Sequence, residues 1–212
     1  MYYVLCIAVI LLIVMLVYIR FIRPWILHMG TTPEERSMLL PGDNLVIEPN
    51  LHYTQAVTIN THTEVIWAYL IQVGYRRGGW YNWDAFNGMS GKDYFYENNK
   101  SAARIIPELQ DLKTNDKIYL TPQIGMDVHE LKKNQVMVLT GYDNGRYLVA
   151  WTFNLQKIDA NQTRLIVRWN SRLGEGWVFN LINRLVVEPG GVGIQQTLML
   201  RGIKKRCEAE SY

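Results

Sequence analysis

The chain has 212 residues, of which 22 are Lys or Arg and 19 are Asp or Glu, so its formal net charge is +3 at pH 7. This positive excess is too small to indicate a nucleic-acid partner, because phosphate binding needs basic residues gathered on one surface. The two cysteines, Cys6 and Cys207, are too few for a disulfide framework or a thiolate metal site within one chain, which favours a reducing compartment.

An uncharged apolar run covers residues 2–19, about the length that a helix needs to cross the hydrocarbon core of a bilayer. A cleaved signal peptide would have a basic residue before the run and small residues after it. Instead, Arg20 and Arg23 follow the run, and the positive-inside tendency places that side in the cytoplasm. We expect residues 1–23 to be a transmembrane anchor of a single-pass cell-membrane protein whose soluble domain is cytoplasmic.

A connector is expected over residues 24–40, before a soluble domain over 41–212. Thr32 followed by Pro33 and two glutamates predicts a short capped helix, and residues 40–43 have turn chemistry. Alternating apolar residues predict a first strand over 53–59. A helix follows, with the capping-box spacing of Thr61 and Glu64 and with Gly74 at its end.

Residues 75–115 form an irregular stretch that is rich in aromatic residues. Glycines at 78 and 79 precede Trp80, Tyr81 and Trp83, and loops on a rigid scaffold often carry binding groups. These rings either line a cavity or pack beneath the loop as a satellite core, since buried Trp and Tyr are common without a ligand.

An antiparallel meander is predicted next, over 116–120, 126–131, 136–142, 147–155 and 163–169, with a hairpin turn at 143–145. Alternation places Tyr147, Trp151 and Phe153 on one face of the fourth strand of this series, and Trp169 joins them from the fifth. Arg164 and Arg168 fall on the opposite face, as solvated residues or as partners of acids on a neighbouring strand.

The C-terminal part is predicted to be helical. A helix is expected over 175–187, broken by Pro189 and two glycines. The spacing of Met199, Ile203 and Cys207 predicts an amphipathic helix after the break. Such a helix would cover the apolar concave face of the meander, which gives an α+β fold.

This order resembles the helix-grip fold of the START-like superfamily, also called SRPBCC, which includes polyketide cyclases and aromatases, lipid-transfer domains and the birch pollen allergen. Several runs look like a membrane-anchored bacterial branch: LPGD (40–43), VIWAYLIQVGYRRGGWYNWD (65–84), PELQDLKTND (107–116), TRLIVR (163–168) and MLRGIKKRCE (199–208). The resemblance implies a curved antiparallel sheet around a long C-terminal helix, here with six strands against seven in larger members. The superfamily uses the same cavity in carriers, sensors and some enzymes, so the resemblance does not imply a particular activity.

No nucleophile turn, zinc motif or dinucleotide fingerprint is present, and the four histidines have no metal-ligand spacing, so neither a cofactor nor a metal is expected. His129 and Glu130 are adjacent in a strand, and their side chains should point to opposite faces. Tyr81, Asp84 or His129 would be the acids or bases of an enzyme. A lone loop carboxylate such as Asp84, however, more often is solvated or caps the main chain.

Two classes of function remain. The favoured hypothesis is a non-enzymatic domain that binds a hydrophobic small molecule or lipid between the sheet and the C-terminal helix. The alternatives are a cyclase-, aromatase- or hydrolase-like enzyme in the same cavity, and an interaction domain whose cavity is filled by side chains. No catalytic residue is assigned, and the candidate ligand-binding residues are Trp80, Tyr81, Trp83, Trp151, Phe153, Trp169 and Met199.

Overall fold

The structure, a computed structural model, describes residues 2–88, 93–97, 99–172, 174, 176 and 181–210. The helices are α1 (Tyr2–Val17), α2 (Arg23–Leu27), α3 (Pro33–Ser37), α4 (Thr63–Ile71), α5 (Asp84–Gly88) and α7 (Ile194–Ala209), with a 3-10 turn η2 (Pro107–Leu109) and π-helical stretches η1 (Tyr18–Ile22) and η3 (Asn183–Gly193). The strands are β1 (Leu51–Ile59), β2 (Lys117–Tyr119), β3 (Gly125–Lys132), β4 (Val136–Asp143), β5 (Arg146–Lys157) and β6 (Thr163–Ser171).

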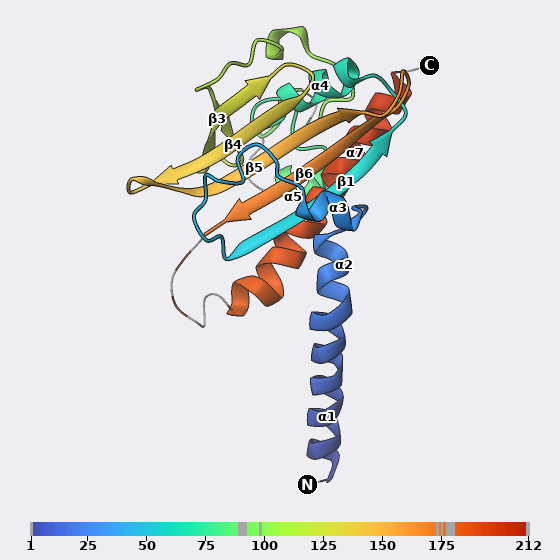
Figure 1. Cartoon of the computed structure of the whole chain (residues 1–212), viewed down its shortest axis with the longest axis vertical. Helices are drawn as coiled ribbons and strands as arrows, with labels where there is room; N and C mark the ends of the chain where they lie inside the picture. Colours follow the sequence, from blue (N-terminus) through green and yellow to red (C-terminus); the bar gives the residue numbers. More distant parts are fainter. Residues whose placement is uncertain are drawn as a thin grey trace.

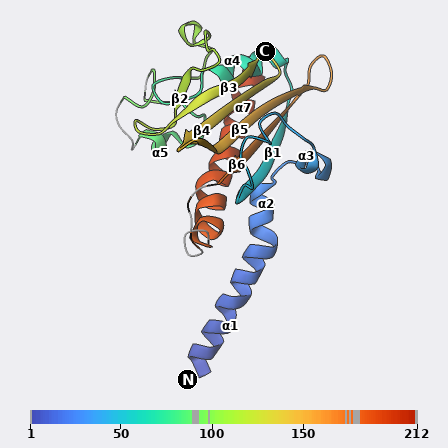
Figure 2. The same cartoon turned by 60° about the vertical axis from the view of Figure 1, so that its left-hand side comes forward.

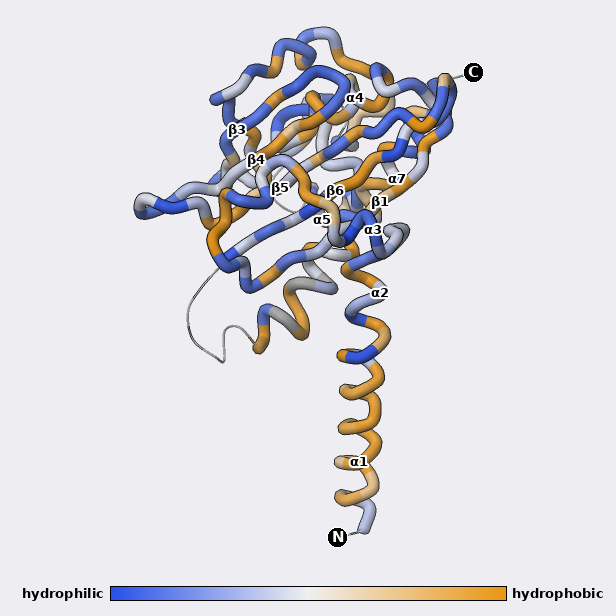
Figure 3. The backbone as a smooth tube through the Cα atoms, in the orientation of Figure 1, coloured by the Kyte–Doolittle hydropathy of each residue, from blue (hydrophilic) through white to orange (hydrophobic). Residues whose placement is uncertain are grey.

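The N-terminal helix projects away from the rest of the molecule (Figure 1). It runs through α1, η1 and α2, and the 23 residues Leu5–Leu27 are long and apolar enough to cross a membrane. At about 1.5 Å per residue they extend roughly 34 Å, against a hydrocarbon core of about 30 Å. Hydropathy along the chain shows this helix as an uninterrupted apolar stretch up to its charged C-terminal part (Figure 3). The expected long apolar helix is therefore present.

The six strands form one antiparallel sheet in the order β1-β6-β5-β4-β3-β2. The predicted hairpin turn between β4 and β5 is confirmed: Asn144 and Gly145 both have positive φ, at 47° and 82°, as tight hairpin turns require. The sheet is curved, and α7 lies along its concave side (Figures 1 and 2). The predicted α+β helix-grip architecture is thus confirmed.

The main core fills the space between the concave face of the sheet and the helices α4 and α7. It contains Tyr53 from β1, Leu70 from α4, Phe153 from β5 and Ile203 from α7, all fully buried. Burial of this apolar surface supplies most of the driving force that holds the helix against the sheet.

The convex face of the sheet is covered by the segment between α2 and β1, and this corrects our expectation for the two arginines. Arg168 is 1% exposed rather than solvated. Its five N–H donors bond Thr54 Oγ1, the Asp43 carboxylate and the main-chain oxygens of residues 35, 36 and 38, over 2.6–3.1 Å. Arg164 pairs with Glu35 at 2.7 Å. The acids come from this segment and not from a neighbouring strand.

The start of α4 also differs from the prediction. The expected capping box of Thr61 and Glu64 is absent, because α4 begins at Thr63 with His62 as its N-cap. The Thr61 carbonyl instead accepts a bond from Thr163 at 2.9 Å, which holds Thr61 at the strand edge. The capped helix predicted at Thr32 is confirmed, with both bonds of its capping box present.

The predicted break at Pro189 is wrong. The chain continues through it as the π-helix η3 and passes directly into α7. The Ile194 N–H bonds the Pro189 carbonyl across five residues, which is the wider hydrogen-bond spacing of a π-helix. Part of the expected helix over 175–187, including Glu175, lies outside the described residues.

Candidate functional site

A cavity of about 230 Å³ lies between the concave face of the sheet, the aromatic loop and the start of α7. Its walls are mainly apolar, with a few amide and hydroxyl groups. The lining residues are Trp80, Asn82, Asn87, Tyr94, Leu120, Thr121, Trp151, Trp169, Gly191, Val192, Gln195, Gln196 and Met199.

Three tryptophans form one side of this cavity. Trp151 and Trp169 are directly opposite each other in the β5–β6 register, and their ring centroids are 5.3 Å apart in an edge-on arrangement. Trp80 stacks on Trp151, with centroids 5.2 Å apart and an interplanar angle of 21°. Strand alternation therefore supplies two of the rings and the loop supplies the third.

The loop reaches this position through a tight turn. Gly74 and Gly79 form an isolated bridge, and both have positive φ, at 125° and 80°. A Cβ at Gly79 would lie 2.6 Å from the Ser101 hydroxyl oxygen, so the turn requires glycine for space as well as for conformation. This turn positions the next residue, Trp80, so that its ring stacks on Trp151.

Gln196 is the polar centre of the wall formed by α7. Its side-chain oxygen accepts bonds from Trp151 Nε1 at 2.8 Å and from the Tyr53 hydroxyl at 3.4 Å. Its side-chain amide donates weakly to the Val167 carbonyl at 3.5 Å. Gln196 is buried, so these bonds satisfy polar groups that would otherwise be costly there.

Other polar atoms of the cavity wall have no partner. Within the described part of the chain, Trp80 Nε1, Trp169 Nε1 and Gln195 Oε1 are buried without a hydrogen bond. The Tyr94 hydroxyl donates to the Leu120 carbonyl at 2.9 Å, and its oxygen lone pairs face the nearby Trp80 N–H, which lowers the pKa of Tyr94. Burial dominates and raises the pKa of Tyr94 to about 12. The cavity thus combines aromatic walls with the indole donor of Trp169 and the amide acceptor of Gln195.

The structure brings together Trp80, Trp151, Trp169 and Met199 from the predicted set at this cavity. Phe153 packs beside Trp151, with ring centroids 4.8 Å apart, deeper in the core. Tyr81 turns away, with its hydroxyl between the Gln72 amide and the Tyr69 carbonyl. Trp83 is 59% exposed, outside the cavity.

Sequence reasoning missed the two glutamines of α7. The signal was available, because Gln196 precedes Met199 by three residues and Ile203 by seven, which is the spacing of one helical face. Gln196 therefore belongs to the buried stripe of α7.

The residues considered as acids or bases lie in separate places. Asp84 accepts bonds from the main-chain N–H of Ser101 at 3.1 Å and from its hydroxyl at 2.5 Å, which is a loop-bracing role. Burial raises the pKa of Tyr81. His129 lies on the convex side of the sheet and contacts the Tyr147 hydroxyl at 3.4 Å. Among the described residues, no group of three His, Cys, Asp or Glu side chains is placed to hold a metal ion.

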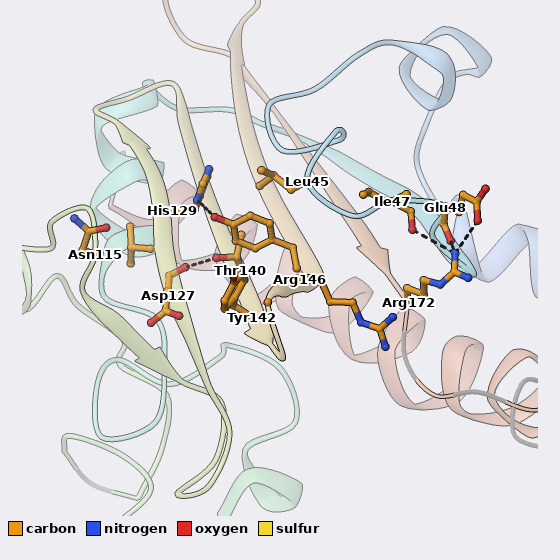
Figure 4. A pocket seen from close by; sticks show the side chains of 13 residues that line it. Leu45, Ile47, Glu48, Asn115, Asp127, His129, Thr140, Tyr142, Arg146 and Arg172 are labelled. Atoms are coloured by element: carbon orange, nitrogen blue, oxygen red, sulfur yellow. Dashed lines mark hydrogen bonds and ion pairs between the residues drawn. The ribbon is translucent and has the colours of Figure 1, made fainter.

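His129 and Tyr147 belong to a second, open groove of about 810 Å³ on the convex side (Figure 4). Tyr147 was expected on the inward face with Trp151, and this is wrong. The β4–β5 register shifts between Gly141 and Tyr142, so a bulge turns Tyr147 outward. The groove also contains the exposed ion pair of Arg172 and Glu48, at 3.0 Å. This groove is larger but mixed in polarity, whereas the aromatic cavity has mainly apolar walls and is therefore the better candidate site for a hydrophobic ligand.

The curved six-stranded antiparallel sheet closed by a C-terminal helix defines the fold class as helix-grip, the architecture that the START-like, or SRPBCC, proteins have. No protein-family model and no curated protein sequence matches the chain.

Several solved structures share the fold. CalC, a self-sacrificing resistance protein from Micromonospora echinospora, is 12% identical over 76% of this chain and 96% of its own, with a TM-score of 0.44. The Aha1 dimer from Colwellia psychrerythraea is 13% identical over 74% and 96%, with a TM-score of 0.45. The Zhui aromatase/cyclase from Streptomyces sp. R1128 is 11% identical over 76% and 96%, with a TM-score of 0.40. At these values the likeness concerns the fold alone.

Proposed function

We propose that the chain is a membrane-anchored helix-grip protein that binds a hydrophobic small molecule or lipid in the cavity between its sheet and α7, without catalysing a reaction. The observation that carries this proposal is the unpaired indole donor of Trp169 in the aromatic wall, with Trp80 Nε1 beside it near the Tyr94 hydroxyl, among the described residues. Buried donors normally have a partner, and an acceptor atom on a bound ligand would supply one.

The volume of the cavity supports a small ligand. An apolar cavity of about 150 Å³ takes up benzene, and pockets for drug-sized ligands span about 300 to 1,000 Å³. The space of about 230 Å³ lies between these sizes. It matches an aromatic or short aliphatic molecule that carries a carbonyl, ether or phenolic oxygen. A lipid would place only part of one chain there.

The composition of the wall supports a binding role over an enzymatic one. Tyr94 is the only ordinarily titratable side chain among the described residues that line the cavity. General acid–base catalysis uses converging groups whose pKa values are tuned toward the working pH, whereas the pKa of Tyr94 is raised to about 12. A cyclase-, aromatase- or hydrolase-like enzyme remains the alternative, and a ligand-free interaction domain is the third reading.

The anchor and the orientation are part of the proposal. Residues 1–23 would span the cell membrane, residues 24–40 would connect, and residues 41–212 would form a cytoplasmic domain. Arg20 and Arg23 follow the apolar run, which supports the cytoplasmic placement. A tether of this kind would hold the cavity where apolar metabolites are concentrated. Protease added to intact spheroplasts should spare the domain, and digestion there would reverse the orientation.

Binding can be tested with acetophenone, a small aromatic ketone, on the full-length protein in lipid nanodiscs. Uptake beside Trp80, Trp151 and Trp169 should quench or shift tryptophan emission with saturation at one molecule per chain. The control is Val192→Phe, which places a ring into the space that acetophenone would occupy. Equal quenching of both proteins, or none of the wild type, would contradict the proposal.

A further inference from the structure

The π-helix η3 and its flanks carry an exposed apolar surface. The exposed side chains are Leu181, Ile182, Val186, Val187 and Ile194, and Val186 is 64% exposed. In a π-helix the hydrogen bonds join residues five apart, so Ile182, the N-cap of η3, lies near Val187. Contiguous exposed apolar surface of this kind marks an interaction site with a protein or a membrane.

Two contacts fix this surface beside the end of the N-terminal helix. The Tyr18 hydroxyl donates to the Leu185 carbonyl at 2.5 Å. The buried side-chain amide of Gln55 donates both to the Ile26 carbonyl at 2.6 Å and to the Gly193 carbonyl at 2.9 Å. Figures 1 and 2 show η3 running alongside the α2 end of the N-terminal helix in both views.

These contacts also set the depth of η3 if the N-terminal helix spans a bilayer. The uncharged run ends just before Arg20, where the hydrocarbon gives way to headgroups. Tyr18 is two residues earlier, which is about 3 Å along the helix axis. Leu185 is bonded to Tyr18, so the exposed side chains of η3 lie at the boundary between headgroups and acyl chains. Interfacial helices bury an apolar face about 5 to 10 Å into that boundary.

We propose that η3 is a second membrane-contacting element, which lies in the headgroup region with Val186 and Val187 inserted among lipid acyl chains. The inference rests on the proposed anchor but needs no ligand. Continuity with the spanning helix selects a lipid surface over a protein partner. The same π-helix contributes Gly191 and Val192 to the cavity wall, so insertion would place that wall next to the bilayer.

The test is spin labelling of the full-length protein in vesicles of phosphatidylcholine and phosphatidylglycerol. In a Cys6→Ala background, single cysteines replace Val186 or Val187 and carry a nitroxide, while Cys207 stays because it is fully buried. Collision rates with oxygen, which partitions into lipid, and with a water-soluble nickel chelate report depth. The references are Leu11→Cys in the spanning helix and Ile158→Cys, which is 53% exposed in the connection between β5 and β6.

We expect the oxygen-to-nickel ratio at Val186 and Val187 to exceed that at Ile158 several-fold and to lie below that at Leu11. A ratio equal to that of Ile158, with a lipid-like value at Leu11, would overturn the inference and leave the anchor standing. An aqueous value at Leu11 would overturn both. A third outcome is that the label at Val186 is shielded from both reagents and shows spin–spin broadening that disappears on dilution with unlabelled protein. This would show that a second copy covers the surface, and it would also overturn the inference that η3 contacts lipid.

Discussion

Trp151 and Trp169 face each other across β5 and β6 with ring centroids 5.3 Å apart, yet within the described chain only the Trp151 indole N–H has a partner. Trp151 donates to Gln196 at 2.8 Å, whereas Trp169 Nε1 is buried and unpaired. The same wall of the cavity therefore holds one donor that stabilises the fold and one that is free for a ligand.

This difference predicts a preference for ligands that carry an acceptor. Acetophenone and α-methylstyrene have nearly the same shape, but only the ketone accepts a hydrogen bond. A net bond of about 1 kcal/mol corresponds to roughly fivefold tighter binding of the ketone. Trp169→Phe should lower this ratio toward one in fluorescence or calorimetric titrations, while Trp83→Phe, which changes an exposed ring, should leave it unchanged. An unaltered ratio in Trp169→Phe would exclude this indole as the donor.

Gln196→Met should destabilise the fold. It leaves the Trp151 N–H without its acceptor in a buried site, at a cost of about 1 to 3 kcal/mol, and also removes the contact of Gln196 with the Tyr53 hydroxyl. The matched control is Gln195→Met, because the Gln195 side-chain oxygen has no partner to lose among the described residues. Thermal unfolding followed by near-UV circular dichroism should show a lower midpoint for the first variant only. Equal midpoints would contradict the structural role of Gln196.

Arg168→Met should destabilise more strongly. It removes five hydrogen bonds and leaves Asp43 without its cation on the covered convex face, and removing one partner of a buried pair costs about 3 to 5 kcal/mol. Arg172→Met is the control, since its pair with Glu48 is exposed and contributes less than about 1 kcal/mol. Similar denaturant midpoints for the two variants would show that the segment before β1 is not held by Arg168.

Stability should fall at alkaline pH. Burial raises the pKa of the Cys207 thiol from 9.0 to about 12 and that of the Tyr94 hydroxyl from 10.0 to about 12. Both groups stay neutral in the folded chain while they ionise in the unfolded chain, so the free energy of unfolding decreases from about pH 9 upward. Their contribution should be constant below about pH 8. Unfolding midpoints that stay level between about pH 8 and pH 11 would argue that these groups are accessible to water.

Periodicity predicted the architecture because strand alternation and helix spacing report directly on burial. It placed Trp151, Phe153 and Trp169 on the inward face, and these residues are buried there. It failed at Tyr147, where a bulge reverses the alternation, and at Pro189, where a π-helix replaces a break. Neither the bulge nor the π-helix produces a repeating hydrophobic pattern that can be recognised in the sequence.

The polar contacts were harder to predict than the apolar ones. Arg168 looked solvated because its partners are mainly carbonyl oxygens of a distant segment, and main-chain atoms carry no sequence signal. The unpaired indole donor of Trp169 likewise depends on the exact placement of rings from two strands and a loop. The sequence shows which aromatic residues share a face of the sheet. Whether their N–H groups have hydrogen-bond partners can be seen only in the structure.

The most direct test of the account is mass spectrometry of apolar compounds that co-purify with the full-length protein in native lipid nanodiscs. Wild type and Val192→Phe, which fills the cavity, are compared with Val186→Phe, which changes an exposed position of the same helix. We expect one small apolar compound with an acceptor oxygen, at about one molecule per chain, in the wild type and Val186→Phe, and its loss from Val192→Phe. Identical compounds in all three, reflecting only the surrounding lipid, would contradict it.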